Sequence, residues 1–389
     1  MSTVGALAGV VAVVAALAAG PSDGTGCAGQ QAPSYPAARE ETGVPLPSPV
    51  PWPAEPVGGT AMGACGDVGP AAPATVTVAS YVLADLDTGA VLAARAPHER
   101  QRPASTLKIL TSLVALRMLG PDQVVDGTAE DLRIDGSKVG IGPGGRYTVR
   151  ELLQGLLLNS GNDAAEALAR ALGGGAATVT AMGGAARELG ALDTRPVTPS
   201  GLDGPGMATS AYDLALVFRA AMREPLFAAT IATRQVPFPG YGDHPGFVVS
   251  NTDRFLPNYP GAIAGKAGFT DAARHTLVVA AQRDGHRLLA VLVRGEQRPV
   301  PMWEQAAVLL DQGFALRAGT PPVGMLVDGP PRAATVTAPA ARAAAPAAAP
   351  PPGAGDGVGR PVGLGVAAGV LVVGLGVVVV ASRRRARRT

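Results

Sequence analysis

The sequence is poor in aromatic residues, cysteine and histidine. Aromatic side chains make up 4% of the 389 residues, and there are two cysteines and four histidines. Neither H-x-x-x-H nor C-x-x-C spacing occurs, so a zinc site has little support, and we expect no metal and no cofactor. The net charge is only +2, and five arginines stand among the last seven residues. A nucleic-acid binder would carry its basic residues on the folded domain, so nucleic acid is not an expected partner.

Long apolar segments lie at both ends of the chain. Residues 1–20 end in small residues, as a secretory signal peptide does, although an uncleaved anchor stays open because no basic residue precedes the apolar run. Near the other end, 361–382 is uncharged and long enough to cross a bilayer as a helix, and the basic tail 383–389 follows at once. The positive-inside rule then predicts a single-pass protein of the cell membrane with an extracytoplasmic body and a cytoplasmic C-terminus.

Composition divides the rest of the chain into a folded part and two linkers. Residues 21–74 are rich in proline and glycine, which predicts a disordered spacer, and 321–360, rich in alanine and proline, predicts a second linker. Cys27 and Cys65 both fall in the first spacer. Outside the cytoplasm they could pair, though nothing in the sequence requires it. The folded domain is therefore expected at 75–320.

Within 75–320 the expected elements run from strands to helices and back to strands. Strand patterns at 76–83 and 90–93 precede an apolar helical stretch at 107–119, and short strands follow within 124–147. Further helices are expected at 149–158, 163–172, 176–189 and 211–222. Strands near 248–251, 263–266, 276–281 and 288–293 and a helix at 303–316 complete the domain. This order predicts an α+β fold rather than β-α-β winding.

Ser105 and Lys108 stand at the start of the first helical stretch. They are three residues apart, so on a helix their side chains lie on one face and within reach of each other. A serine becomes a good nucleophile when a neighbouring base takes its proton, and a lysine with a lowered pKa can be that base. The ordinary alternative is that Ser105 only caps the helix and Lys108 is solvated.

Two further motifs favour the catalytic interpretation. Residues 159–162, Asn-Ser-Gly-Asn, join two expected helices, and residues 265–268, Gly-Lys-Ala-Gly, lie on an expected strand. Each has an ordinary alternative, a helix–helix loop in one case and a protective edge lysine in the other. The order Ser-x-x-Lys, Ser-x-Asn, Lys-x-Gly nevertheless resembles that of penicillin-binding proteins and serine β-lactamases.

Longer segments narrow the resemblance. Residues 79–83, 102–108, 159–165 and 200–206 are similar to the D-alanyl-D-alanine carboxypeptidases of the low-molecular-mass penicillin-binding class, the S11 serine peptidases. The similarity covers roughly 75–317. It implies a β-lactamase/transpeptidase-like fold, an antiparallel sheet packed with helices plus a helical lobe. It also implies a carboxypeptidase that removes the terminal D-alanine from peptidoglycan stem peptides through an acyl-enzyme, with β-lactams as covalent inhibitors.

The resemblance further implies a role for each site residue. Ser105 would attack the substrate carbonyl, Lys108 would take the serine proton, and Ser160 would pass a proton to the leaving amine. The oxyanion would lie between the backbone N–H groups of Ser105 and Phe269. Substrate-binding groups are expected on the second motif, on the third motif and beyond the last strand: Asn162, Lys266, Gly268, Phe269, Thr270 and Arg298.

Ala267 departs from the family pattern, which has threonine at this position to help hold the substrate's terminal carboxylate. Thr270 or Arg298 could supply part of that interaction. The departure keeps open a weak or inactive homologue that only binds penicillin or peptidoglycan. A D,D-endopeptidase shares all three motifs and also stays open. A β-lactamase is less favoured, because no separate glutamate-containing motif for fast deacylation is found.

Overall fold

The computed structural model describes residues 29, 32–33, 37–316 and 319–330, all within one compact unit. The expected signal peptide at 1–20, the membrane helix at 361–382, the basic tail at 383–389 and most of the second linker lie outside the described residues. Among the residues that are described, no helix is long and apolar enough to cross a membrane.

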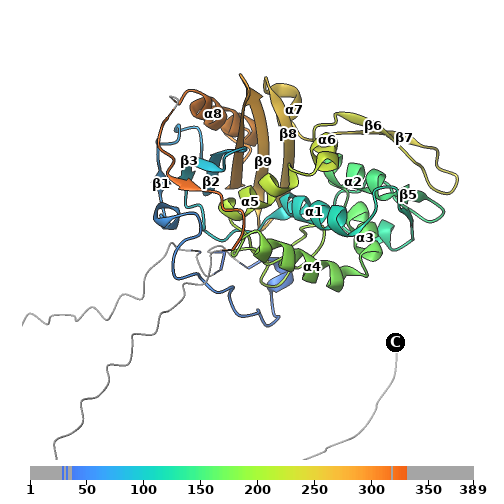
Figure 1. The fold of residues 1–389 in the computed structure, drawn as a ribbon. Coiled ribbons are helices and arrows are strands. Elements are labelled where there is room, and N and C mark those ends of the chain that lie inside the picture. The colour runs from blue at the N-terminus through green and yellow to red at the C-terminus, as the bar shows by residue number, and fades with distance from the viewer. Residues whose placement is uncertain (1–28, 30–31, 34–36, 317–318, 331–389) are drawn as a thin grey trace, which may run out of the picture. The chain divides into compact units, whose positions relative to one another are not determined.

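An antiparallel seven-stranded sheet stands at the centre of the domain (Figure 1). The strand order is β1-β3-β2-β10-β9-β8, and β11 also pairs with β3. The edge strand β8 borders the segment that carries Ser105, so the sheet's end forms one side of the candidate site. The strand bounds are β1 Asp67–Val68, β2 Ser80–Asp85, β3 Ala90–Arg95, β8 Ala262–Thr270, β9 Arg274–Arg283, β10 His286–Gly295 and β11 Gly324–Met325.

Helices cover both faces of this sheet. Helix α8, Met302–Phe314, packs on one face through Leu309 and Leu310. Helix α5, Ala211–Ala221, lies against β2 and β10 on the other face and begins the helical lobe. Both faces are covered, and the buried parts of the central strands β9 and β10 are apolar except for Thr276.

Helix α1, Lys108–Met118, runs through the middle of the helical lobe and is buried from Lys108 to Ala115. It contacts α2, α3, α4 and α5. The predicted helices are thus confirmed, and so is the α+β fold. The helices and 3-10 turns (η) not bounded above are α2 Val149–Leu158, α3 Asn162–Ala171, α4 Gly175–Glu188, α6 Pro225–Ile231, α7 Phe255–Asn258, η1 Arg39–Glu41, η2 Thr60–Gly63, η3 Ala104–Leu107 and η4 Asp131–Arg133.

Local sequence signals account for several element ends. Helix α2 begins with a capping box, in which Thr148 Oγ1 accepts from the Glu151 N–H and the Glu151 carboxylate accepts from the Thr148 N–H. The short strands expected in 124–147 are present as the pair β4, Val124–Asp126, and β5, Arg146–Thr148. A second hairpin, β6 Gln235–Phe238 with β7 Phe247–Ser250, was predicted only in its second strand.

The structure corrects the prediction that residues 21–74 form a disordered spacer. Residues 37–68, named here the N-terminal strap, are ordered along the domain and end in β1, which pairs with β3. Val57 and Met62 belong to the main hydrophobic core. A proline-rich segment has few backbone partners of its own, and here arginines of the domain supply them: Arg100 donates to the carbonyls of Val50 and Pro51.

The other domain boundary is also corrected. Strand β11 pairs with β3 and Leu326 is buried, so the first residues of the expected 321–360 linker belong to the domain. The Tyr212 hydroxyl donates to the Met325 carbonyl and fixes this segment. In the strap, Cys65 is disulfide-bonded, and the only other cysteine in the chain is Cys27.

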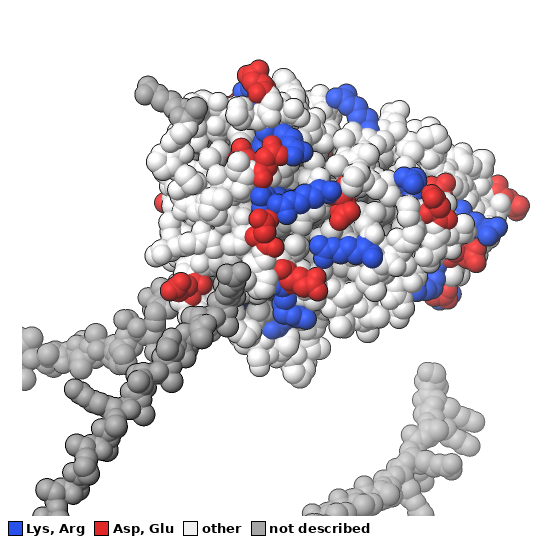
Figure 2. Space-filling model, viewed as in Figure 1, with Lys and Arg blue, Asp and Glu red and all other residues white. Residues whose placement is uncertain are grey.

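Charged side chains of both signs lie beside one another on the face drawn in Figure 2. Many are paired, as are Arg283 with Asp311 and Arg287 with Asp87. Exposed pairs of this kind each stabilise a fold by about 1 kcal/mol or less. The stability of the domain therefore rests mainly on its core and on a few buried networks.

Candidate active site

Ser105 lies in the short η3 turn that runs directly into α1. Ala104, just before it, has a φ of 49°, in the left-handed region that non-glycine residues rarely adopt. Such a conformation costs about 1–3 kcal/mol and persists where the surroundings enforce it. Ser105 is half-buried, and its Oγ lies within hydrogen-bond distance, 2.9 Å, of Lys108 Nζ. The structure thus brings Ser105 and Lys108 together as their spacing predicted.

Lys108 has neutral groups as its hydrogen-bond partners. Its Nζ lies 2.9 Å from Ser105 Oγ, 2.7 Å from Asn162 Oδ1 and 2.6 Å from the Ser200 carbonyl. A neutral amine has two N–H donors and one lone pair. Asn162 Oδ1 and the Ser200 carbonyl can only accept, so they take the two donors and the lone pair is left for the Ser105 hydroxyl. This geometry suits a base that removes the Ser105 proton.

The electrostatic setting of Lys108 favours that neutral form. Burial lowers the pKa of Lys108 well below its usual value, and the positive charge of Lys266 lowers it further. The charges of Asp163 and Glu166 act in the opposite direction and are outweighed. A lysine that is neutral near physiological pH can act as a general base, which a solvated lysine cannot.

Ser160 and Lys266 form a second pair beside the first. Lys266 Nζ donates to Ser160 Oγ at 3.1 Å and to the Ala267 carbonyl at 2.7 Å. Ser160 has a φ of 58°, so it too is held in the left-handed region. Burial lowers the pKa of Lys266 to about 8, although the negative charge of Asp253 opposes the shift. The three sequence motifs therefore meet in one place.

Asp163 holds the Ser160 loop and was not singled out from the sequence. It is fully buried at the start of α3, and its carboxylate accepts from the backbone N–H groups of 139–141 at 2.7 to 3.0 Å. Asn162 adds a link, because its Nδ2 donates to the Asp135 carbonyl at 2.6 Å. A charged residue directly after the Ser-x-Asn motif, in the first turn of a helix, was the available signal.

Gly268 is required by the close approach of β8 to the nucleophile. A Cβ at this position would lie 2.7 Å from Ser105 N and 2.6 Å from Thr276 Oγ1. Thr276 in turn donates to the Pro103 carbonyl, which ties β9 to the segment before Ser105. Glycine thus lets the edge strand lie against the start of η3. Phe269 follows on the same strand, and the oxyanion role of its N–H stays a prediction.

The contact to the substrate's terminal carboxylate depends on what replaces the threonine missing at position 267. The candidates named from the sequence were Thr270 and Arg298. Ala267 is exposed on β8 and offers no hydroxyl. The Thr270 oxygen accepts from the Ala273 N–H, and Thr270 lies near the Asp203 carboxylate, whose pKa it lowers, so its hydroxyl already has neighbours within the domain. Arg298 is exposed on the loop between β10 and α8, and Arg294, not Arg298, lines the cavity beside Phe269. The geometry therefore supports neither proposed substitute for the missing threonine.

A serine hydrogen-bonded to a buried lysine, with a second serine–lysine pair between an edge strand and a helical lobe, defines a serine hydrolase of the acyl-transferring class. The chain matches the Peptidase_S11 profile, described as D-alanyl-D-alanine carboxypeptidase, over residues 67–297. It belongs to this family.

Named relatives agree with this assignment. The chain is 47% identical over 241 residues to the D-alanyl-D-alanine carboxypeptidase DacB2 of Mycobacterium tuberculosis, covering 61% of this chain and 82% of the relative. It is 32% identical over 242 residues to DacF of Bacillus subtilis, covering 61% of this chain and 62% of DacF.

Solved structures are similar over the same region. A D-alanyl-D-alanine carboxypeptidase from M. tuberculosis H37Rv has a TM-score of 0.62 at 42% identity, covering 70% of this chain and all of that one. The Streptomyces K15 DD-transpeptidase has a TM-score of 0.59 at 27% identity, covering 64% of this chain and all of that one.

Proposed function

We propose that the domain is a serine D-Ala-D-Ala carboxypeptidase that trims peptidoglycan stem peptides through an acyl-enzyme. The observation that carries the proposal is the fully buried Lys108, whose hydrogen-bond partners among the described residues are all neutral and whose Nζ lies 2.9 Å from Ser105 Oγ. Desolvation keeps this lysine available as a base.

In the acylation step, Ser105 Oγ attacks the carbonyl carbon of the penultimate D-alanine while Lys108 takes the hydroxyl proton. The Ser105 and Phe269 N–H groups would stabilise the oxyanion, at about 3 kcal/mol per donor. The C–N bond then breaks, and the proton that Lys108 took from Ser105 would pass through Ser160, which is hydrogen-bonded to Lys266, to the leaving D-alanine amine. Lys108 is then neutral again for the next step. Lys266 also provides positive charge for the substrate's terminal carboxylate.

In the deacylation step, water attacks the ester carbonyl, and Lys108 Nζ is the base closest to Ser105 Oγ among the contacts described. The proton taken from water returns to Ser105 as the ester bond breaks, and the shortened peptide leaves. A β-lactam would acylate the same serine, because its strained amide presents a carbonyl in place of the scissile bond. Its product, still tethered, would be released slowly.

We also propose that the domain lies outside the cytoplasm and is anchored by 361–382. The disulfide at Cys65 supports this location, since disulfides persist in oxidising compartments. Adding protease to intact cells should remove the catalytic domain and leave the C-terminal segment in the membrane fraction. Survival of the domain in intact cells would contradict the topology.

The central test uses the full chain and its Ser105→Ala variant. The unaltered protein should release D-alanine from a stem pentapeptide and become covalently labelled by a fluorescent penicillin, and the variant should do neither. Covalent labelling of the variant would contradict the role of Ser105. Labelling of the unaltered protein without D-alanine release would favour a binding homologue, which the exposed Ala267 makes the second candidate. Rapid release of hydrolysed penicillin would indicate a β-lactamase.

A further inference from the structure

A cavity of about 780 Å³ lies beside the nucleophile, and the N-terminal strap forms one of its walls. Its lining includes residues 37–40 of the strap, Asp135, Asp203 and residues 269–272. Asp135 is next to the site because its carbonyl accepts from Asn162, the residue that contacts Lys108. The strap therefore reaches the catalytic cleft from a part of the chain that precedes the three motifs.

The direction of β8 tells which part of a substrate this cavity faces. Gly268 lies against Ser105, with Lys266 two residues before it and Thr270 two residues after it. Strand residues rise about 3.3 Å each, so these two ends of β8 lie on opposite sides of the reacting carbonyl. Lys266 and Ser160 serve the departing D-alanine, and the cavity adjoins Thr270. It lies on the acyl side, where the rest of the stem peptide must extend.

Glu41 holds the strap against the site. Its side chain is buried, and its carboxylate accepts from the Ala38 N–H at 2.9 Å, from the Arg102 guanidinium at 2.5 Å and from the Gly206 N–H at 3.2 Å. Burial alone would raise the pKa of Glu41, but the Ala38 N–H and Arg102 outweigh it and keep the pKa below its usual value. The carboxylate is therefore ionised at neutral pH.

The partners of Glu41 belong to two segments of the catalytic site. Arg102 stands three residues before Ser105. Gly206 closes the loop that begins with Ser200, whose carbonyl accepts from Lys108. One carboxylate of the strap thus joins the segment that enters the nucleophile turn to the loop that orients the base. The side chains next to it, Arg39 and Glu40, stay exposed at the cavity.

We propose that the N-terminal strap is part of the substrate-binding site: the turn at 39–41 forms the acyl-side wall, Arg39 and Glu40 contact the peptide, and Glu41 is the positioning residue that holds the wall. The proposal rests on the carboxypeptidase function. Long acyl peptides reach the wall, whereas a substrate with a short acyl group ends before it. The strap therefore selects for the length of the acyl portion.

The first experiment compares two substrates on the full chain carrying Arg39→Ala and Glu40→Ala together. Both side chains are exposed, so the variant folds without disturbing the core. Losing one or two polar contacts should lower kcat/KM for a stem pentapeptide about fivefold, mainly through KM. Turnover of a short N-acyl-D-Ala-D-Ala substrate and the rate of penicillin acylation should stay unchanged. An equal effect on both substrates, no effect on either, or faster pentapeptide turnover would overturn the proposal.

The second experiment tests the anchor with Glu41→Gln, which keeps the shape of the side chain and removes its charge. The same selective rise in KM for the pentapeptide is expected. Glu55→Gln, an exposed position of the strap away from the cavity, is the matched control and should be silent. A Glu41→Gln variant that binds both substrates as the unaltered chain does would overturn the anchoring role. Absence of penicillin labelling and of D-alanine release in the unaltered chain would instead overturn the carboxypeptidase function.

Discussion

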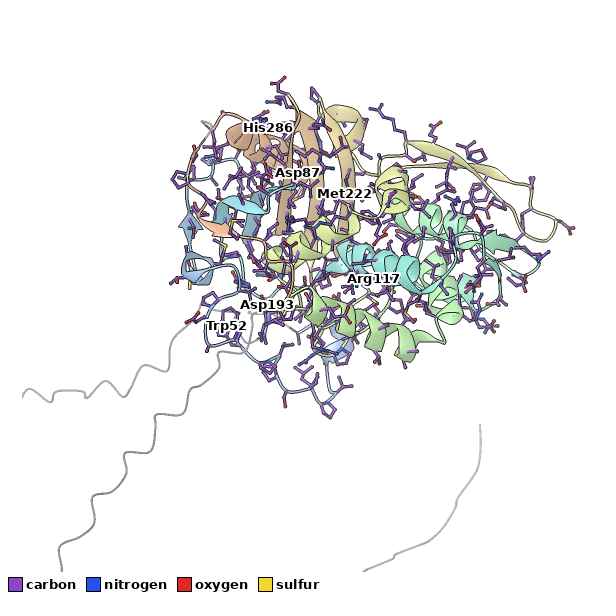
Figure 3. All side chains as sticks on the ribbon, viewed as in Figure 1. Trp52, Asp87, Arg117, Asp193, Met222 and His286 are labelled. Atoms are coloured by element: carbon purple, nitrogen blue, oxygen red, sulfur yellow. The ribbon has the colours of Figure 1, made fainter. Side chains whose placement is uncertain are left out.

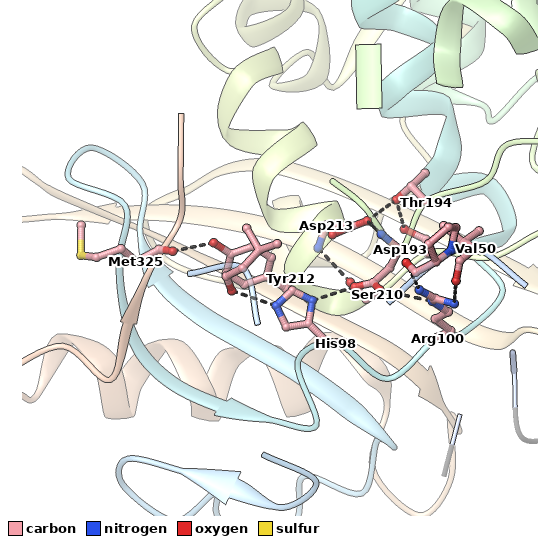
Figure 4. A network of polar contacts seen from close by, with 12 residues as sticks. Val50, His98, Arg100, Asp193, Thr194, Ser210, Tyr212, Asp213 and Met325 are labelled. Carbon is pink, nitrogen blue, oxygen red and sulfur yellow. Dashed lines mark hydrogen bonds and ion pairs between the residues drawn. The ribbon is translucent and has the colours of Figure 1, made fainter. Parts of the chain in front are cut away.

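Two of the buried clusters of titratable side chains in the described part of the domain differ in how their charges are balanced. In the active site, Lys108 and Lys266 are both fully buried, and all the hydrogen-bond partners found for their amines are neutral. Under the strap, His98 and Arg100 are equally buried but lie against the carboxylate of Asp193 (Figure 4). Burial lowers the pKa values of the two lysines in the first cluster. In the second cluster the negative charge of Asp193 offsets the effect of burial on His98.

The cluster under the strap works as an anchor. His98 Nδ1 lies 2.7 Å from Asp193 Oδ2, and Nε2 lies 2.9 Å from the Val57 carbonyl, which can only accept. Trp52 packs edge-on against His98 and lies under the Arg100 guanidinium, close to Asp193 (Figure 3). Burial alone would lower the pKa of His98, but the hydrogen bond and charge of Asp193 outweigh it and raise the pKa.

His98, Asp193 and Asp213 offer the atom types of a metal site, yet the ligand atoms of His98 and Asp193 already have other partners. Both ring nitrogens of His98 and both oxygens of Asp193 are already in hydrogen bonds or ion pairs. Burial and the charge of Asp193 raise the pKa of Asp213 to about 8, so this carboxyl is protonated at neutral pH. A network whose charges are compensated in this way stabilises the fold, whereas an uncompensated one leaves a group ready to react.

The largest expected effect comes from Lys108→Met, which removes the unbalanced base. Penicillin acylation should slow by at least about 10⁴-fold, the scale seen when one member of a catalytic unit is removed. Stability to urea should not fall, because a buried amine with a depressed pKa is replaced by an apolar side chain of similar length. Lys138→Ala, on an exposed lysine near the same loop, is the control. A loss below about tenfold would contradict the role of Lys108 as base.

Asp193→Asn, in the compensated cluster, should lower stability and leave activity nearly unchanged, the opposite of Lys108→Met. It leaves His98 and Arg100 buried without their counter-charge, which should lower the free energy of unfolding by about 3–5 kcal/mol. Acylation by penicillin, measured at a temperature where the variant is still folded, should change little, since the contacts found for Asp193 in the described part of the chain are with His98, Arg100 and Asp213 and not with catalytic groups. Chemical denaturation and acylation kinetics on the same sample separate the two effects. Wild-type stability would show that the network does not anchor the strap.

The two clusters also differ in how much of them the sequence could predict. Ser105 and Lys108 are neighbours on one helical turn, and the other two motifs have fixed short spacings, so local patterns predicted the site. The anchor joins residues 50–57, 98–100 and 193–213, and no local pattern records such contacts. For the same reason the strap was predicted as a spacer: its order comes from Arg100 and Arg102, which lie far along the chain.

A rise in pH should change the contributions of the two clusters to folding stability in opposite directions. Lys266 has a folded pKa of about 8, below its unfolded value near 10.4, so its contribution to stability grows as pH rises through this window. His98 and Asp213 have raised folded pKa values, so their contributions are present at low pH and are lost as pH rises through those values. Asp213→Asn, which mimics the protonated acid, should therefore flatten the decline. An unchanged stability–pH profile in that variant would contradict this assignment.

The pH dependence of kcat/KM should be set by the protonation of Lys108 and Lys266 alone. Because Lys108 acts as the neutral amine, kcat/KM should rise with pH as it loses its proton. Because Lys266 binds the substrate carboxylate as a cation, kcat/KM should fall again near pH 8, where the free enzyme loses that charge. The Asp213→Asn variant should keep this bell-shaped profile. If Asp213→Asn shifted the pH at which kcat/KM falls, the two clusters would be coupled.

The smallest expected effect concerns Ala267, the position in the active site that lacks the hydroxyl of the family's threonine. Ala267 stands next to Lys266 with its side chain exposed, where the family has a threonine hydroxyl. Ala267→Thr adds one hydrogen-bond donor for the substrate carboxylate, and a bond to a charged group contributes about 1.5–3 kcal/mol, so kcat/KM should rise at least tenfold. Ala267→Val has the same shape without the hydroxyl and should give no gain. Equal gains in both variants would mean that packing on β8 limits activity. No gain in either would mean that another group already holds the carboxylate.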